Sequence, residues 1–211
     1  MKLAPILALL AMVALGACSS PEPYDYSALL AAKPRSILVL PPINNSLEVD
    51  ASYACLSTVS VPLAERGYYV FPVALVDEMM KENGLPTPVE MHGVAPQKLR
   101  EIIGADAALY LNVNQWGTSY QVLNSVTRVV VTAQLVDLRT GQVLWQGARS
   151  MSKGSHGGGL VESMVGALVN QVVSSISNPS VGLSSEAQFS LYGNEYNGLL
   201  PGPYRPAEDD S

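Results

Sequence analysis

One stretch of the chain alternates in a way typical of a half-buried β-strand. Apolar side chains fill every odd position from 129 to 135, and most even positions from 128 to 134 are polar. This period of two places one set of side chains on each face of a sheet. Residues 137–141 (Asp-Leu-Arg-Thr-Gly) form a turn sequence, and residues 143–146 begin a second strand. The pattern predicts a long antiparallel hairpin, so we expect the chain to fold around a sheet.

The residues before the hairpin predict parallel strands connected by helices. A continuous apolar run at 36–40 is typical of a strand buried on both faces, and residues 68–71 and 108–113 predict two further strands. Apolar spacing and glycine stops predict helices over 52–65, 73–83, 97–104 and 160–177. Because a strand–helix–strand start implies parallel pairing, we expect an α/β domain over residues 36–178. Its mixed five-stranded sheet would carry about four packed helices.

The first predicted helix and the loops around it carry more specific expectations. Ser52 is the expected N-cap of this helix, and Pro62 predicts a kink or an early end. Residues 43–46 are expected to form a loop after the first strand, and residues 85–96, with three prolines, are expected to form another. Cys55 lies on the apolar face of the helix, where a buried thiol is the expected role and an interchain disulfide the alternative.

The N-terminal residues look like a targeting segment. Lys2 is followed by an unbroken apolar and small-residue stretch that ends in Leu15-Gly16-Ala17-Cys18. The stretch is shorter than the roughly 20 residues that cross a bilayer. It resembles the bacterial lipoprotein signal, in which the cysteine is acylated and becomes the mature N-terminus. We therefore expect a signal peptide at 1–17 and a lipidated Cys18, with an ordinary signal peptide or an uncleaved anchor as alternatives.

The residue types after Cys18 bear on localisation. Ser19 and Ser20 follow the cysteine and no Asp is adjacent to it, which by resemblance to lipoprotein sorting signals indicates the outer membrane. We expect the folded domain in the periplasm, with surface display as the alternative. Residues 18–35 hold three prolines and show no strong period, so they predict a flexible tether. Residues 179–211 predict a tail or a strap over the domain, and Leu199 and Leu200 favour the strap.

Composition excludes several functional classes. The chain has 18 acidic and 12 basic residues, a formal net charge of −6, so clustered phosphate contacts and nucleic-acid binding are not expected. Two cysteines and two histidines are too few for a zinc or iron–sulfur cage, and we expect no metal and no cofactor. Trp116 and Trp145 are expected to fill the core.

Candidate catalytic residues are sparse. His92 lies in the proline-rich loop and His156 in a glycine-rich segment, Lys-Gly-Ser-His-Gly-Gly-Gly at 153–159. That segment lacks the G-K-[ST] ending of a phosphate-binding loop, and no G-x-S-x-G nucleophile motif occurs. We expect both histidines to be solvated loop residues and the protein not to be an enzyme. A hydrolase using either histidine is the alternative.

Several segments together resemble one family. They are Leu-Pro-Pro-Ile-Asn-Asn-Ser (40–46), Gly-Leu-Pro-Thr-Pro (84–88), Lys-Leu-Arg-Glu-Ile-Ile-Gly-Ala-Asp-Ala (98–107), Asn-Gln-Trp-Gly-Thr-Ser-Tyr (114–120), Leu-Val-Asp-Leu-Arg-Thr-Gly (135–141) and Leu-Trp-Gln-Gly (144–147). The set resembles Gram-negative lipoproteins catalogued as domain of unknown function 799. More distantly it is similar to CsgG-type curli secretion lipoproteins, the TolB N-terminal domain and peptidoglycan-synthase-activating lipoproteins.

The resemblance implies a mixed-sheet α/β domain in an envelope complex, with no catalytic residues to carry over. We expect a non-catalytic outer-membrane lipoprotein that acts through protein–protein contacts in secretion, transport or assembly. A CsgG-like lipoprotein is a candidate partner, and a homo-oligomer is compatible with this hypothesis. Asn44, Asn45 and Ser46 form the candidate partner-contact loop. The alternative function is a regulator that binds peptidoglycan or its synthases.

Overall fold

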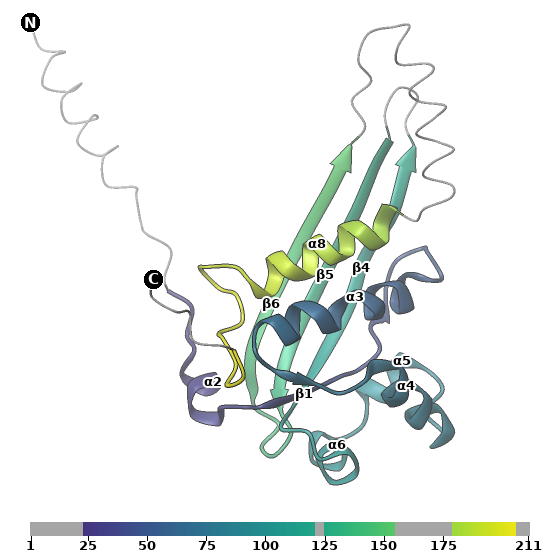
Figure 1. The fold of residues 1–211 in the computed structure, drawn as a ribbon. Coiled ribbons are helices and arrows are strands. Elements are labelled where there is room, and N and C mark those ends of the chain that lie inside the picture. Colours follow the sequence, from purple (N-terminus) through teal and green to yellow (C-terminus); the bar gives the residue numbers. More distant parts are fainter. Residues whose placement is uncertain (1–22, 121–124, 155–178, 206–211) are drawn as a thin grey trace, which may run out of the picture.

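The computed structural model describes residues 23–120, 125–154 and 179–205 (Figure 1). Its helices are α2 (Ser27–Ala32), α3 (Ala51–Glu65), α4 (Val73–Glu82), α5 (Pro88–His92), α6 (Pro96–Ile103) and α8 (Pro179–Tyr192). Its strands are β1 (Ser36–Val39), β2 (Ile43–Asn44), β3 (Tyr69–Val70), β4 (Ala107–Tyr120), β5 (Ser125–Asp137) and β6 (Val143–Gly154). None of the described helices combines the length and apolarity needed to cross a bilayer.

The strands form one mixed sheet in the order β3-β1-β4-β5-β6. β1 runs parallel to β3 and β4, whereas β4, β5 and β6 are antiparallel neighbours. This confirms the expected α/β class and the long hairpin. The described sheet has six strands instead of five, because Ile43–Asn44, expected in a loop, forms β2 and pairs with Asn112 and Val113 of β4. A two-residue strand is too short to produce a recognisable period.

Helices cover both faces of the sheet around β1. α3 and α8 lie side by side across one face (Figure 1) and enclose a first core with Ile37, Val39 and the odd-numbered residues of β5. Leu38 and Leu40 point to the other face, where α4, α5 and α6 supply a second core. β1 is therefore buried on both sides, as its continuous apolar run predicts. Trp116 and Trp145 are both buried in the first core, which confirms their expected role.

Three described helices were not expected from the sequence. α2 lies within the predicted tether and buries Leu29 in the first core. α5 lies within the predicted loop and begins with a capping box between Thr87 and Glu90. α8 occupies the start of the predicted tail, and its inward face includes Ser180, Ser184 and Gln188. Because these buried side chains are polar, the sequence of α8 lacks the helical spacing of apolar residues that would predict it. The helix expected over 160–177 lies outside the described residues.

The expected N-cap of α3 was wrong, and so was the early end that was one of the two expectations for Pro62. Asp50, not Ser52, occupies the N-cap position, and the Ser52 hydroxyl donates instead to the carbonyl oxygen of Pro42 at 2.6 Å. The helix continues past Pro62 to Glu65, so the proline does not end it. The Ser52 hydrogen bond attaches the start of α3 to Pro42, which lies between β1 and β2.

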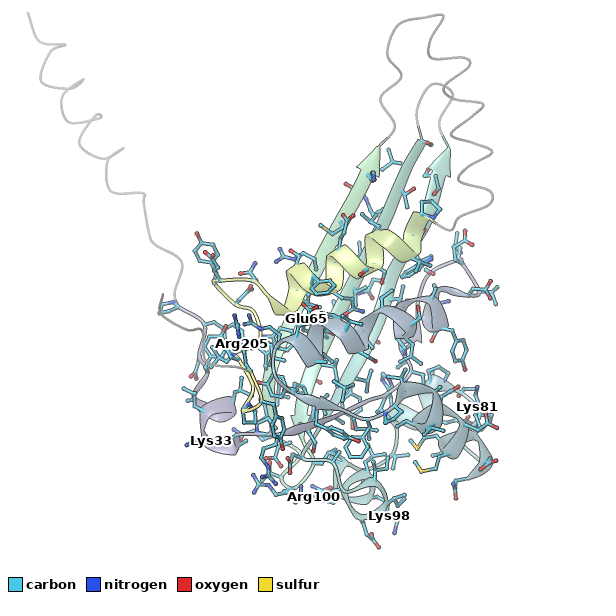
Figure 2. All side chains as sticks on the ribbon, in the orientation of Figure 1. Lys33, Glu65, Lys81, Lys98, Arg100 and Arg205 are labelled. Carbon is cyan, nitrogen blue, oxygen red and sulfur yellow. The ribbon has the colours of Figure 1, made fainter. Side chains whose placement is uncertain are left out.

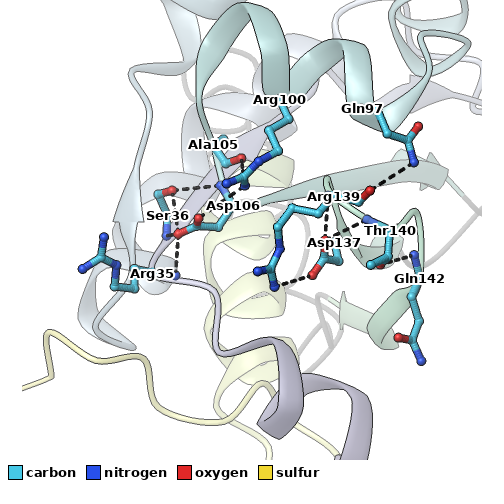
Figure 3. Close-up of polar contacts among 10 residues, drawn as sticks. All are labelled: Arg35, Ser36, Gln97, Arg100, Ala105, Asp106, Asp137, Arg139, Thr140 and Gln142. Atoms are coloured by element: carbon cyan, nitrogen blue, oxygen red, sulfur yellow. Dashed lines mark hydrogen bonds and ion pairs between the residues drawn. The ribbon is translucent and has the colours of Figure 1, made fainter.

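Two carboxylates accept several hydrogen bonds at the end of the sheet where β1 and β4 begin and β5 ends (Figure 3). Asp106 accepts hydrogen bonds from the backbone N–H groups of Arg35 and Ser36, at 3.0 and 3.3 Å. Asp137 accepts from the backbone N–H groups of Arg139 and Thr140, at 2.6 and 3.1 Å. Burial alone would raise the pKa of each carboxyl group, but hydrogen bonds outweigh it and hold both pKa values below the ordinary value.

Replacement of Asp137 tests this contribution. Asp137→Ala should lower the free energy of unfolding at pH 7 by about 1–3 kcal/mol, because two backbone donors lose a charged acceptor. A carboxyl whose pKa is lower in the folded state stabilises above its unfolded pKa, near 4. That stability disappears as pH falls through the folded pKa. The variant's stability should therefore fall less steeply on acidification, as measured by urea unfolding at several pH values.

Glu101→Ala is the control for this prediction. The Glu101 carboxylate pairs with Lys98 at 2.9 Å on the exposed surface of α6. Exposed pairs contribute at most about 1 kcal/mol, so this variant should unfold nearly as the parent does. Equal losses in the two variants, or an unchanged acid profile for Asp137→Ala, would contradict the assigned role of Asp137.

Candidate partner-binding surface

The loop between β2 and α3 is closed by its own polar side chains. The Asn44 Oδ1 atom accepts from the backbone N–H of Ser46 at 2.9 Å and from its hydroxyl at 2.7 Å. The Asn44 Nδ2 group donates to the carbonyl oxygen of Glu48 at 2.7 Å. An asparagine that bonds to the backbone two residues further on imitates a backbone turn. Residues 44–49, called the contact turn below, therefore have a defined conformation.

The contact turn is also attached to the sheet. The Asn45 backbone N–H donates to the carbonyl oxygen of Val113 at 2.8 Å, and its side-chain amide donates to Asn114 Oδ1 at 3.3 Å. The Glu48 side chain lies against Gly117, where a Cβ atom would be 3.0 Å from Glu48 Cγ. Gly117 also has a φ of +115°, which favours glycine. The turn thus rests on β4.

Two apolar side chains project from this braced turn. Leu47 is 100% exposed and Val49 is 88% exposed. Single exposed apolar residues are common on protein surfaces, but these two lie two residues apart on a turn with a fixed backbone. The hydrogen bonds that hold this turn involve the three predicted contact residues, Asn44, Asn45 and Ser46. The sequence does not predict that Leu47 and Val49 are exposed, because an aliphatic residue near a strand is normally part of the core.

An aromatic ring and an ion pair lie together where the first turn of α3, which follows the contact turn in the chain, meets α4. Tyr53 is partly exposed, and Lys81 Nζ lies 4.9 Å from the centre of its ring. Lys81 also pairs with Asp77 at 2.7 Å, and that hydrogen bond raises the pKa of the lysine. Figure 2 shows Lys81 at the same side of the domain as the start of α3. The start of α3 and α4 thus present an aromatic ring and a cation held by Asp77 on the same side of the domain as the contact turn.

His92 does not have the environment expected of it. It ends α5, its Nε2 atom is 2.9 Å from the carbonyl oxygen of Pro41, and its ring packs edge-on against Tyr110. The expectation of a solvated loop histidine was wrong because residues 88–92 are helical. Burial lowers the pKa of His92, which favours the neutral imidazole. The ring therefore attaches the end of α5 to the residues after β1 and to β4.

The thiol of Cys55 is buried as well. Cys55 is fully buried, and the Gln188 side-chain amide donates to its sulfur at 3.2 Å. Burial raises the pKa of Cys55 to about 12, so the thiol stays protonated. The expectation of a buried thiol is confirmed. Within residues 23–120, 125–154 and 179–205, no three His, Cys, Asp or Glu side chains converge as a metal site would require. Cys18 and His156 lie outside these ranges.

The chain is similar in sequence to known proteins over most of its length. The model of a family described as "Putative lipoprotein GNA1162-like" matches residues 24–204. "Putative lipoprotein NMB1124/NMB1162" from Neisseria meningitidis serogroup B is 44% identical over 204 residues, which is 94% of each chain. The crystal structure of lipoprotein GNA1162 from Neisseria meningitidis is 46% identical with a TM-score of 0.56, and it covers 69% of this chain and 99% of that one.

A weaker structural match has no bearing on function. The C-terminal domain of LpoB from Salmonella enterica has 19% identity and a TM-score of 0.42 over 56% of this chain and 84% of that one. The family model, in contrast, spans the described domain from α2 to the residues after α8. The chain belongs to the GNA1162-like lipoprotein family.

Proposed function

We propose that the protein is a non-catalytic, lipid-anchored envelope protein that binds a protein partner through the contact turn. The observation that carries the proposal is the complete exposure of Leu47 on a turn fixed by Asn44 and Ser46. In this function the protein is a component of a secretion, transport or assembly complex. The folded domain contributes a recognition surface and no chemistry.

The anchor in this proposal is an acylated Cys18. Ser19 and Ser20 follow it, and by the sorting rule this sequence directs the protein to the outer membrane with the domain in the periplasm. Each acyl chain contributes about 0.8 kcal/mol per buried methylene group, so two or three chains hold a folded domain stably at a bilayer.

Two contributions to the free energy of binding favour a partner at the contact turn. Removing one aliphatic side chain from water contributes about 1.5–3 kcal/mol, and Leu47 and Val49 together supply two such side chains. The hydrogen bonds of Asn44 hold the turn in one conformation before binding, so little backbone entropy is lost on association.

Site-specific crosslinking in cells tests the proposal. A photoreactive phenylalanine analogue replaces Leu47 in one strain and Ile102 in another; Ile102 is also exposed but lies on α6. We expect adducts with envelope proteins at position 47 and none of the same adducts at position 102. Leu47→Ser combined with Val49→Ser should reduce copurification of the crosslinked protein by about 10-fold or more.

The identity of the adduct separates the partner classes. A CsgG-like lipoprotein or another export component would support a role in secretion or transport. A peptidoglycan synthase, or retention on isolated sacculi that depends on Leu47, would favour the regulator. Identical adducts at positions 47 and 102, or copurification unaffected by the double substitution, would refute the contact turn as the binding surface.

A further inference from the structure

The two ends of the described chain are fixed side by side. The Tyr26 hydroxyl donates to the carbonyl oxygen of Gly198 at 2.6 Å, which joins the start of α2 to the residues after α8. The Tyr68 hydroxyl donates to the carbonyl oxygen of Leu200 at 2.8 Å, and Leu199 is fully buried in the first core. α2 and residues 193–205 thus form one end of the domain, called the anchor end below, at the left of Figure 1.

The distance from Cys18 to the anchor end is short. Pro23 is the first described residue, five positions after Cys18. A chain spans at most about 3.3–3.6 Å per residue, so the two Cα atoms lie within about 18 Å of each other. An acylated Cys18 therefore keeps this end of the domain next to the membrane surface.

The anchor end presents the side chains that suit a membrane interface. Tyr196 is 82% exposed, Tyr204 is 60% exposed and Leu30 is 57% exposed. Asn194 Oδ1 accepts from the backbone N–H of Tyr196 at 2.8 Å, and this bond holds the tyrosine on a turn. Tyrosine is enriched at headgroup level because its ring is apolar and its tip is polar. Lys33, labelled in Figure 2, is also exposed at this end.

We propose that the anchor end lies against the phospholipid headgroups of the membrane that holds Cys18, with Leu30, Tyr196 and Tyr204 in the interfacial layer. The inference rests on the acylation of Cys18 in the proposed function. Three exposed side chains bind a bilayer weakly on their own. Because Cys18 already holds the protein at the bilayer through a short connection, these side chains meet the lipid at a high effective concentration. The weak contact is therefore formed in a large fraction of the molecules.

Electrostatic attraction is not the main contribution to the contact between the anchor end and the lipid. Lys33, Arg35 and Arg205 lie at the anchor end and attract anionic headgroups, whereas the exposed Glu195 at the same end repels them. The sequence after Arg205 contains Glu208, Asp209 and Asp210, which oppose that attraction. The aromatic and aliphatic side chains therefore carry the contact, and it should persist at high ionic strength.

This orientation also places the contact turn. In Figure 1 the loop between β2 and α3 lies at the opposite side of the domain from α2 and residues 193–205. With the anchor end on the lipid, the contact turn lies on the side of the domain away from the membrane, where a partner can reach it from the aqueous phase.

Quenching by headgroup-labelled lipids tests the proposal on the full-length lipidated protein. The protein is reconstituted into phosphatidylethanolamine–phosphatidylglycerol vesicles that carry a spin label on a headgroup. A fluorophore is attached to Lys33→Cys in one sample and to Leu47→Cys in another; Cys55 is buried and does not compete for the label. We expect at least threefold stronger quenching at position 33 than at position 47, and no loss of that difference in 0.5 M salt.

A surface variant separates contact from mere proximity. Leu30→Ser, Tyr196→Ser and Tyr204→Ser together should bring quenching at position 33 down to nearly that at position 47, with an unchanged melting temperature. Three results would overturn the inference: equal quenching at both positions, a difference abolished by salt, or unaltered quenching in the triple variant. If the parent protein fails to float with vesicles, the anchor of the proposed function fails and this inference falls with it.

Discussion

Trp145→Ala is expected to lower the free energy of unfolding by about 3–5 kcal/mol. Trp145 is fully buried on β6, and its ring packs 5.8 Å from that of Tyr192 on α8. Its indole N–H donates to the carbonyl oxygen of Asn197 at 2.9 Å. The single side chain thus joins the sheet, α8 and residues 193–205, and its removal leaves a cavity where all three meet. Urea unfolding followed by circular dichroism measures the loss.

Two variants control this measurement. Trp145→Phe keeps most of the packing but lacks the indole donor, so it should cost distinctly less than alanine. Val143→Ala, on the same strand at a partly exposed position, should cost less than about 1 kcal/mol. If Trp145→Ala were no more destabilising than Val143→Ala, Trp145 would not be the residue that joins these elements.

Gly67→Ala is expected to have the second largest effect, about 2–3 kcal/mol. Gly67 has a φ of +88°, a conformation that costs an L-residue about 1–2 kcal/mol. A Cβ atom there would also overlap the backbone nitrogen of Arg205 and lie 2.7 Å from its Cβ. Residues 202–205 would have to move away, which breaks the bond from the Tyr204 N–H to the Gly67 carbonyl oxygen. That adds about 1 kcal/mol per lost hydrogen bond.

Gly84→Ala provides the matched control, because it has the same backbone conformation without the contact. Its φ is +83°, and nothing lies within 4 Å of the position that an alanine methyl group would take there. It should lose only the conformational part, about 1–2 kcal/mol. Limited proteolysis should release the C-terminal residues faster in Gly67→Ala than in Gly84→Ala. Equal unfolding free energies for the two variants would mean that residues 202–205 contribute nothing at Gly67.

Much of the sheet could be predicted because its signal is local. The alternation from 128 to 135 predicts β5, and the run at 36–40 predicts a strand covered on both faces. α8 could not be predicted in the same way, because it buries Ser184 and Gln188 against α3, where they meet Thr58 and Cys55. An amphipathic pattern appears only when the partner surface is apolar, and this partner surface is partly polar.

The sequence predicts the turn of the candidate surface but not its exposed aliphatic side chains. Asn44, Asn45 and Ser46 are typical turn residues, so a loop with a special conformation could be predicted there. That Leu47 and Val49 are exposed depends on which way the turn faces, and this is decided by the contacts of Asn45 and Glu48 with β4. Such contacts join residues far apart in the sequence, such as Asn45 and Asn114, which are 69 positions apart, and leave no local pattern.

The packing of the last helix has a consequence for how the chain acquires its structure. Arg66 donates to the carbonyl oxygen of Leu199 across 133 positions, and Tyr26 reaches Gly198 across 172. Contacts of such long range slow folding, because the intervening loop must close before the contact forms. The first core stays incomplete until almost the entire polypeptide has been synthesised. A chain that lacks residues 193–205 would therefore lack part of the first core, and its folded state would be less stable than that of the whole chain.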